Sequence, residues 1–95
     1  METEPRQLGE LIRQFLREQG MEELLWSARL PQIWANVVGN PAARVSHIRS
    51  FTQGELVVEV TVPAWRVELR LRAEELRRRL NEQLGAEYVR KLVIR

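Results

Sequence analysis

Six arginines lie between Ala64 and Leu84, in the run AWRVELRLRAEELRRRLNEQL. A guanidinium group recognises phosphate through several N–H donors, so an arginine cluster is a common footprint of a nucleic-acid partner. Charge runs also serve simply to keep an amphipathic helix in solution. The main functional question posed by the sequence is whether these arginines bind phosphate or only form a solvated surface.

No arrangement of side chains for catalysis accompanies the arginines. His47 is the only histidine, and it lies in an expected strand without a neighbouring carboxylate or a second metal ligand. Aspartate and cysteine are absent, which excludes aspartate-dependent phosphoryl transfer, thiol catalysis, thiolate metal sites and disulfides. The Walker, GxGxxG and nucleophile-elbow motifs are missing as well. The sequence therefore predicts a protein that is not an enzyme and has no catalytic, cofactor or metal site.

Positive charge is concentrated in the second half of the chain. Residues 1–40 hold four arginines against six glutamates, whereas residues 41–95 hold eleven basic and seven acidic residues. Fourteen of the 15 basic residues are arginine, which suits phosphate recognition but is explained at least as well by genome base composition. If a polyanion binds, the second half of the chain is expected to bind it.

Apolar residues at helical spacing predict three helices in the first 40 residues. The first apolar stripe consists of Leu8, Leu11, Ile12, Phe15 and Leu16. The second consists of Met21, Leu24, Leu25 and Ala28. The third, in a short helix, consists of Ile33, Trp34, Val37 and Val38. Gly20 suits the end of the first helix, Pro31 the start of the third, and Gly39 its end.

The pattern changes to an alternation of period two after residue 42, which predicts strands. Ala43–Phe51 is expected to form one strand and Glu55–Val62 a second, joined as a hairpin through Gly54. Pro63 then starts a long helix that Gly85 ends, and Tyr88–Arg95 is expected to be the last strand. The order predicts a single α+β domain over residues 1–95, with three strands and with helices that pack on the sheet; residues 1–6 are expected to be disordered.

Helical geometry divides the arginines of the long helix into two groups. At about 100° per residue, the leucines and Trp65 form the face that packs on the sheet. Arg72 and Arg79 lie on a flank where Glu68 and Glu75 pair with them at i, i+4 spacing. The opposite flank is the predicted basic stripe, which is opposed only by Glu74 and consists of Arg66, Arg70 and Arg77.

Several other residues are candidates for contacts. Val67 and Leu71 are expected to project from the solvent side of the long helix beside Arg78, as a patch for a partner or a second copy of the chain. Trp34 either packs in the core or presents an edge to a partner, and packing is also the simpler interpretation of Trp26 and Trp65. The basic residues outside the stripe that are expected to extend a nucleic-acid surface are Arg44, Arg49 and Lys91.

Four segments in this order and spacing resemble the DciA family, bacterial proteins tied to loading or operating the replicative helicase. They are LGELIRQFLREQGMEELL, IWANVVGN, LVVEVTVPAWRVELRLR and LRRRLNEQLGAEYVRKLVIR. The resemblance covers nearly the whole chain. Its most specific parts are Trp34 with Val37-Val38-Gly39, Ala64-Trp65 with Glu68-Leu69, and Leu80-Asn81 followed by Gly85 and the closing Ile94-Arg95.

The resemblance implies a KH-like domain, in which helices pack on one face of a three-stranded mixed sheet. It also implies that the domain assists the replicative helicase onto single-stranded DNA and has some DNA affinity of its own, without nucleotide hydrolysis. It is a resemblance to a short form, because many members continue into a long basic extension whereas this sequence ends at Arg95. The GxxG element with which RNA-binding KH domains clamp a nucleic-acid backbone is absent.

The sequence and the resemblance together predict a non-enzymatic adaptor that binds the replicative helicase and, weakly, DNA, with single-stranded DNA preferred. Its expected location is the cytoplasm, since no apolar run approaches the roughly 20 residues of a membrane span. No small-molecule substrate is expected. The alternatives are a stand-alone module for single-stranded DNA or structured RNA, and a domain that forms a weak homodimer through Val67 and Leu71.

Overall fold

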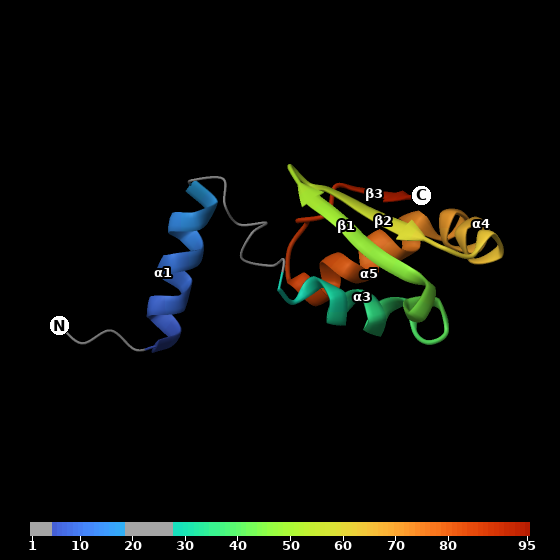
Figure 1. Ribbon diagram of the computed structural model, residues 1–95. Coiled ribbons are helices and arrows are strands. Elements are labelled where there is room, and N and C mark those ends of the chain that lie inside the picture. Colours follow the sequence, from blue (N-terminus) through green and yellow to red (C-terminus); the bar gives the residue numbers. More distant parts are fainter. Residues whose placement is uncertain (1–4, 19–27) are drawn as a thin grey trace.

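The computed structural model describes residues 5–18 and 28–95 (Figure 1). The elements in chain order are α1 (Pro5–Glu18), α3 (Leu30–Val38), the short 3-10 helix η1 (Ala42–Val45), β1 (Ser46–Thr52), β2 (Glu55–Val60), α4 (Pro63–Leu71), α5 (Ala73–Leu84) and β3 (Lys91–Ile94). The predicted second helix falls almost entirely outside the described residues, as does Trp26. None of the described helices is both long and apolar enough to cross a membrane.

The three strands form one mixed sheet, as predicted, and the structure gives their order as β1-β2-β3. β1 and β2 are antiparallel and joined by a tight turn at Gln53 and Gly54, which both have positive φ angles. Glycine suits this turn because it adopts positive φ without a steric cost. β3 returns after two helices to pair with β2 in parallel. β2 is therefore the central strand, and β1 and β3 are the two edges.

The helices α3, α4 and α5 cover one face of this sheet, where the core lies (Figure 1). The alternation in β2 turns Leu56, Val58 and Val60 inward, where all three are completely buried. Leucines from α3, α4 and α5 meet them from the other side: Leu30, Leu69, Leu76, Leu80 and Leu84. Burial of apolar surface between these two layers supplies the main driving force for folding. The predicted α+β, KH-like arrangement is confirmed.

The first and last strands are shorter than predicted, for reasons that lie in hydrogen bonding. Residues 42–45 form the 3-10 helix because their backbone groups bond locally, for example from Arg44 N–H to the carbonyl oxygen of Pro41 at 3.1 Å. Near the C-terminus, the backbone of Val89 bonds to the side chain of Asn81 instead of to a strand. β3 therefore begins only at Lys91. β2 likewise ends at Val60, and Val62 becomes the residue that precedes α4.

The single long helix predicted over residues 63–84 is in fact two helices that meet at Arg72. The N–H of Arg72 donates to Leu69 O at 3.2 Å and ends α4, while its carbonyl accepts from Leu76 N at 2.9 Å and starts α5. α4 packs over β2 and β3, whereas α5 packs against α3 and β3. The two halves contact different elements, and this packing overrides the continuous helical pattern. Arg72 pairs with Glu75 at 3.5 Å, so the predicted pairing with Glu68 is replaced.

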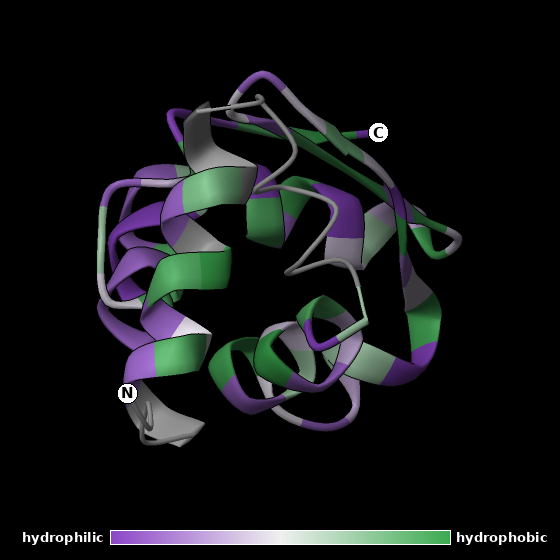
Figure 2. Cartoon of the chain, turned by 90° about the vertical axis from the view of Figure 1, so that its left-hand side faces the viewer, coloured by the Kyte–Doolittle hydropathy of each residue, from purple (hydrophilic) through white to green (hydrophobic). Residues whose placement is uncertain are grey.

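The predicted first helix is confirmed as α1, but its apolar stripe is not in the core. The exposed fractions of Leu8, Leu11, Ile12 and Phe15 lie between 49% and 59%. One side of α1 is accordingly hydrophobic in Figure 2, and Figure 1 shows α1 apart from the layer formed by the sheet and the other helices. An exposed stripe of this kind is typical of a helix that contacts a partner.

Candidate nucleic-acid and partner interfaces

Arg66 and Arg70, from the predicted basic stripe, bind backbone carbonyls at the ends of two strands. Arg66 Nη2 donates to Val60 O at 2.9 Å, where β2 ends. Arg70 Nε donates to Ile94 O at 2.9 Å, where β3 ends. The Nε of Arg66 is buried without a hydrogen-bond partner among the described residues. Both guanidinium groups therefore fasten α4 to the sheet, and that of Arg70 also remains exposed to solvent.

Arg77 makes the most extensive contacts of the three. Its Nε and Nη2 donate to both carboxylate oxygens of Glu74, at distances from 2.6 to 3.1 Å. Its Nη1 donates to Glu87 Oε2 at 3.0 Å and to Val89 O at 3.1 Å. The hydrogen bonds from Arg77 hold the pKa of Glu74 below its ordinary value, and the same contacts with Glu74 and Glu87 raise the pKa of Arg77. Only 18% of the Arg77 side chain is exposed.

These contacts distinguish the three arginines in their capacity to bind phosphate. The guanidinium group has five N–H donors, and Arg70 uses one of them in the contact with Ile94. Arg77, by contrast, carries the compensating charges of Glu74 and Glu87, whereas the sequence indicated Glu74 alone. Of the three, Arg70 is therefore the most accessible to a further acceptor, whereas Arg77 links α5 to the segment before β3.

The remaining basic candidates lie on opposite edges of the sheet. Lys91 begins β3 and is exposed, at the end of the strand opposite to Ile94, which Arg70 contacts. Arg49 forms the bulge in β1, and its Nε lies 3.1 Å from Glu59 Oε2. Arg44 is exposed on η1, just before β1. The structure thus places Lys91 and Arg70 at opposite ends of β3, with Arg44 and Arg49 on or next to β1 at the other edge of the sheet.

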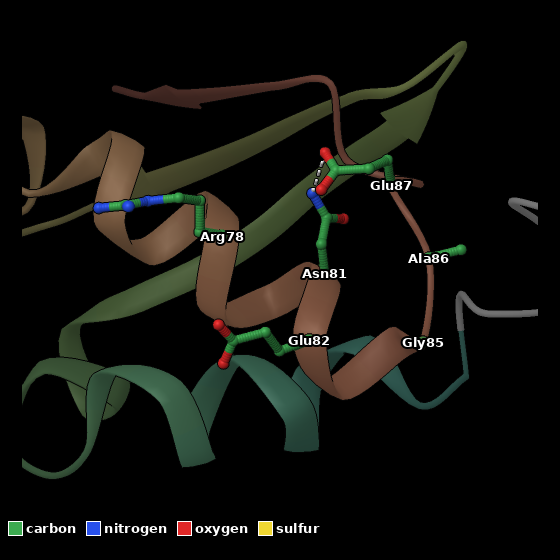
Figure 3. A pocket seen from close by; sticks show the side chains of 6 residues that line it. All are labelled: Arg78, Asn81, Glu82, Gly85, Ala86 and Glu87. Atoms are coloured by element: carbon green, nitrogen blue, oxygen red, sulfur yellow. Dashed lines mark hydrogen bonds between the residues drawn. The ribbon is translucent and has the colours of Figure 1, made fainter.

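The predicted partner residues differ sharply in exposure. Val67 and Leu71 are 58% and 79% exposed on the outer side of α4. Arg78 is exposed on α5 and lines an open pocket of about 420 Å³, in which its side chain extends away from Asn81 and Glu87 (Figure 3). Trp34, in contrast, is only 2% exposed, and its Nε1 donates to Ser46 Oγ at 2.8 Å. The indole of Trp34 is therefore a core group.

The part of the chain that the structure describes holds no group of three or more histidine, cysteine, aspartate or glutamate side chains able to bind a metal ion. His47 is exposed on β1. The described surface presents basic side chains, such as Arg70 and Lys91, and the exposed apolar side chains of Val67 and Leu71.

Residues 7–94 match the family model DciA, described as "Dna[CI] antecedent, DciA". The chain belongs to the DciA family. It is also 33% identical over 93 residues to a UPF0232 protein of Streptomyces avermitilis, in an alignment that covers 96% of this chain and 51% of the relative. The chain thus spans about half the length of the curated relative that it matches.

The DciA match extends from α1 to β3 and therefore includes every candidate residue described above. The junction between α4 and α5, where a nucleic-acid-binding KH domain would carry GxxG, reads Leu71-Arg72-Ala73-Glu74. The backbone clamp of those domains has no equivalent in this DciA-family sequence. Any nucleic acid bound here is expected to be held by side chains.

Sequence reasoning missed the structural importance of Asn81. It is only 4% exposed, and its side-chain amide bonds both backbone groups of Val89. The signals in the sequence were the Leu80-Asn81 pair of the DciA resemblance and the position of Asn81 next to the leucine face of the helix. A buried asparagine normally requires hydrogen-bond partners, but sequence spacing alone does not identify them.

Proposed function

We propose that this chain is a non-enzymatic adaptor that binds the bacterial replicative DNA helicase and assists its loading or operation on single-stranded DNA. The observation that carries the proposal is the match to the DciA family over residues 7–94. The exposed apolar and basic side chains support a role in binding macromolecules. Such an adaptor would act in the cytoplasm, where the chromosome is replicated.

The proposed contact with the helicase is the apolar patch on α4, made of Val67 and Leu71, with Arg78 on α5 as a further contact. These aliphatic side chains are exposed, whereas Leu69, which lies between them in the sequence, is completely buried. Fully burying a leucine or valine side chain is worth about 1.5–3 kcal/mol. Two such residues can therefore supply a substantial part of the affinity of a small interface. Trp34 would influence this contact only indirectly, by supporting the core.

The proposed DNA contacts are Arg70 and Lys91 on the β3 side of the sheet, with Arg44 and Arg49 on the β1 side. Arg66 and Arg77 would contribute positive potential but are already engaged with carbonyls and carboxylates. Binding that depends on a few phosphate contacts should be weak and strongly dependent on salt. Contacts of this kind would hold the strand close to the helicase without reading its sequence.

The proposal is tested by fluorescence anisotropy with the labelled chain and the replicative helicase from the same organism, with and without an oligothymidine strand. Saturable helicase binding at micromolar concentration or tighter, persisting at salt concentrations that abolish DNA binding, is the expected result. A folded sample that does not bind the helicase, alone or with DNA, contradicts the adaptor.

The net positive charge of the second half of the chain favours a second candidate, a stand-alone nucleic-acid-binding module. This alternative predicts binding to oligothymidine or structured RNA without helicase binding. In either case, changing Arg70 and Lys91 together to alanine should reduce the slope of log affinity against log salt by about 0.7 per lost contact. Arg79→Ala, which removes a guanidinium outside the proposed set, is the control. An unchanged slope in the double variant would remove these two residues from the DNA surface.

A further inference from the structure

β3 forms an edge of the sheet, and its outward backbone groups can be identified from its hydrogen bonds to β2 and the adjoining turn. The N–H of Lys91 donates to Gly54 O at 3.1 Å, and the N–H of Arg95 donates to Val58 O at 2.8 Å. Backbone groups alternate in direction along a strand, so residues 91, 93 and 95 point their N–H and C=O groups toward β2. Leu92 and Ile94 therefore point theirs away from β2.

The contact of Arg70 with β3 agrees with this direction. Its Nε donates to Ile94 O, so this carbonyl indeed lies on the outer side of the strand. A carbonyl oxygen has two lone pairs, and Leu92 adds an outward N–H and C=O of its own. Because Ile94 is only 5% exposed and Leu92 is partly exposed, the row is most accessible around Leu92, where an extended peptide can add as a further strand.

The side chains around this edge are strongly basic. Arg90 and Lys91 stand at the start of β3, Arg95 follows its end, and Arg70 lies against Ile94; all four are exposed. Of the acidic residues near this row, Glu59 pairs with Arg49 and Glu87 with Arg77, whereas Glu55 lies opposite Lys91 on β2, so the four basic side chains still outnumber the acidic ones. The edge is therefore complementary in charge to an acidic segment.

The same charges argue against a second copy of the chain as the occupant. Two β3 strands paired antiparallel about Val93 would set Lys91 of each copy opposite Arg95 of the other, and like charges directly opposite one another are destabilising. The other edge of the sheet is less suitable, because the bulge at Arg49 interrupts β1. We propose that the outer edge of β3 binds an extended, acidic segment of a protein partner by strand addition. This inference goes beyond helicase binding through α4, since it concerns a different surface.

The experiment uses the full chain labelled with ¹⁵N and an end-capped peptide of alternating glutamate and valine. Peptide binding is expected to slow amide hydrogen exchange at Leu92 and Ile94 by roughly tenfold or more, because strand addition turns these outward N–H groups into hydrogen-bonded ones. A peptide of alternating lysine and valine is the matched control and is expected not to bind. No slowing at these two amides at peptide saturation overturns the proposal, as does equal slowing by both peptides.

Single charge reversals locate the site. Lys91→Glu and Arg95→Glu are each expected to weaken binding of the glutamate peptide by about threefold to fivefold, the effect of one exposed ion pair. Arg79→Glu makes the same charge change on α5 and is expected to leave the affinity within about twofold. Equal weakening by all three variants would mean attraction to net charge alone and would overturn the proposal. If a variant fails to fold, the exchange measurement on the unaltered chain still shows whether the peptide binds at the edge of β3.

The same exchange measurement is repeated with oligothymidine in place of the peptide, to test whether this edge binds nucleic acid. Slowed exchange at Leu92 and Ile94 with oligothymidine, and not with the acidic peptide, would reassign this edge to nucleic acid and overturn the proposal. Helicase binding that is lost in Leu71→Glu, while peptide binding at β3 persists, separates the two surfaces. Failure of the proposed helicase contact and failure of strand addition are thus distinguishable.

Discussion

Asn81 and Val89 form a two-way hydrogen bond that ties α5 to the segment leading into β3. Asn81 Oδ1 accepts from Val89 N–H at 2.8 Å, and Asn81 Nδ2 donates to Val89 O at 2.9 Å. Both residues are buried, so neither backbone group of Val89 has ready access to water. The asparagine takes the place that a neighbouring strand would otherwise fill, and Arg77 adds a second hydrogen bond to the same carbonyl.

Replacing Asn81 with leucine should therefore destabilise the fold strongly. The substitution keeps similar volume but removes both bonds, leaving the N–H of Val89 unpaired and its carbonyl with Arg77 alone. A buried polar group left unsatisfied costs about 1–3 kcal/mol. Urea unfolding monitored by circular dichroism measures the free energy of unfolding. Gln83→Leu, at an exposed position of the same helix, is the control and should change that free energy by less than about 0.5 kcal/mol. Equal effects of the two variants would contradict the role given to Asn81.

The pair of Arg77 with Glu74 predicts a stability difference that depends on pH. The pKa of Glu74 in the folded chain lies below its ordinary value of 4.5, because its carboxylate accepts hydrogen bonds from Arg77. A carboxylate with a lowered pKa stabilises the fold when the pH is above the ordinary value, and this stabilisation is lost as the pH falls through the lowered pKa. Glu74→Gln should therefore destabilise the chain at pH 7 and have progressively less effect below about pH 4.5.

Urea unfolding at pH 7, 5 and 3 tests the Glu74 prediction. Glu82→Gln, an exposed glutamate of the same helix, makes the same change in net charge and is the matched control. If the two variants show the same dependence on pH, the stabilisation comes from overall charge and the specific contact with Arg77 is not its source.

Local patterns in the sequence predict much of the fold because they reflect local physics. The alternation of Leu56, Val58 and Val60 marks a strand with one buried face, and these three side chains are indeed completely buried. Pro63 and Gly85 mark the start of α4 and the end of α5, where Gly85 adopts a positive φ of 87°. Each of these signals acts within a few residues of its position.

The features that the sequence did not predict depend on partners distant in the chain. No glycine or proline lies at the break between α4 and α5 at Arg72. The break arises because the two helices pack against different elements. Helical spacing correctly predicts that Arg66, Arg70 and Arg77 lie on the same flank. It does not predict that each guanidinium group donates a hydrogen bond to a backbone carbonyl, which belongs to Val60, Ile94 and Val89 respectively. The arginines of the basic stripe therefore help to hold α4 and α5 against the sheet, a role that the composition of the stripe does not indicate.

The hydrogen bond between Trp34 and Ser46 predicts an energetic coupling between α3 and β1. Trp34→Phe keeps most of the aromatic ring but removes the Nε1 donor, whereas Ser46→Ala removes the acceptor and the further bond from Ser46 Oγ to Ala42 O at 2.8 Å. In a double-mutant cycle the two substitutions should couple by about 1 kcal/mol in the free energy of unfolding. Strictly additive effects would contradict an energetically significant bond.

Leu71→Glu should separate the role of the α4 patch in binding from any role in folding. Leu71 is 79% exposed, so the substitution should change the free energy of unfolding by less than about 0.5 kcal/mol. If Leu71 is buried against the helicase, the introduced carboxylate would be placed in an apolar contact. Helicase affinity in the anisotropy assay should then fall by about tenfold or more, as expected for the loss of a well-packed interface residue.

Leu11→Glu is the matched control, because Leu11 is 57% exposed on the apolar stripe of α1. If only Leu71→Glu weakens helicase binding, the contact lies on α4; if only Leu11→Glu does, it lies on α1 and the proposed patch is wrong. Sedimentation of the unaltered chain tests the remaining alternative, a homodimer through the same patch. A dimer that Leu71→Glu dissociates would favour self-association, since two copies would then bury the leucine that the helicase is proposed to cover. A monomer at high concentration would leave Leu71 free for a different partner.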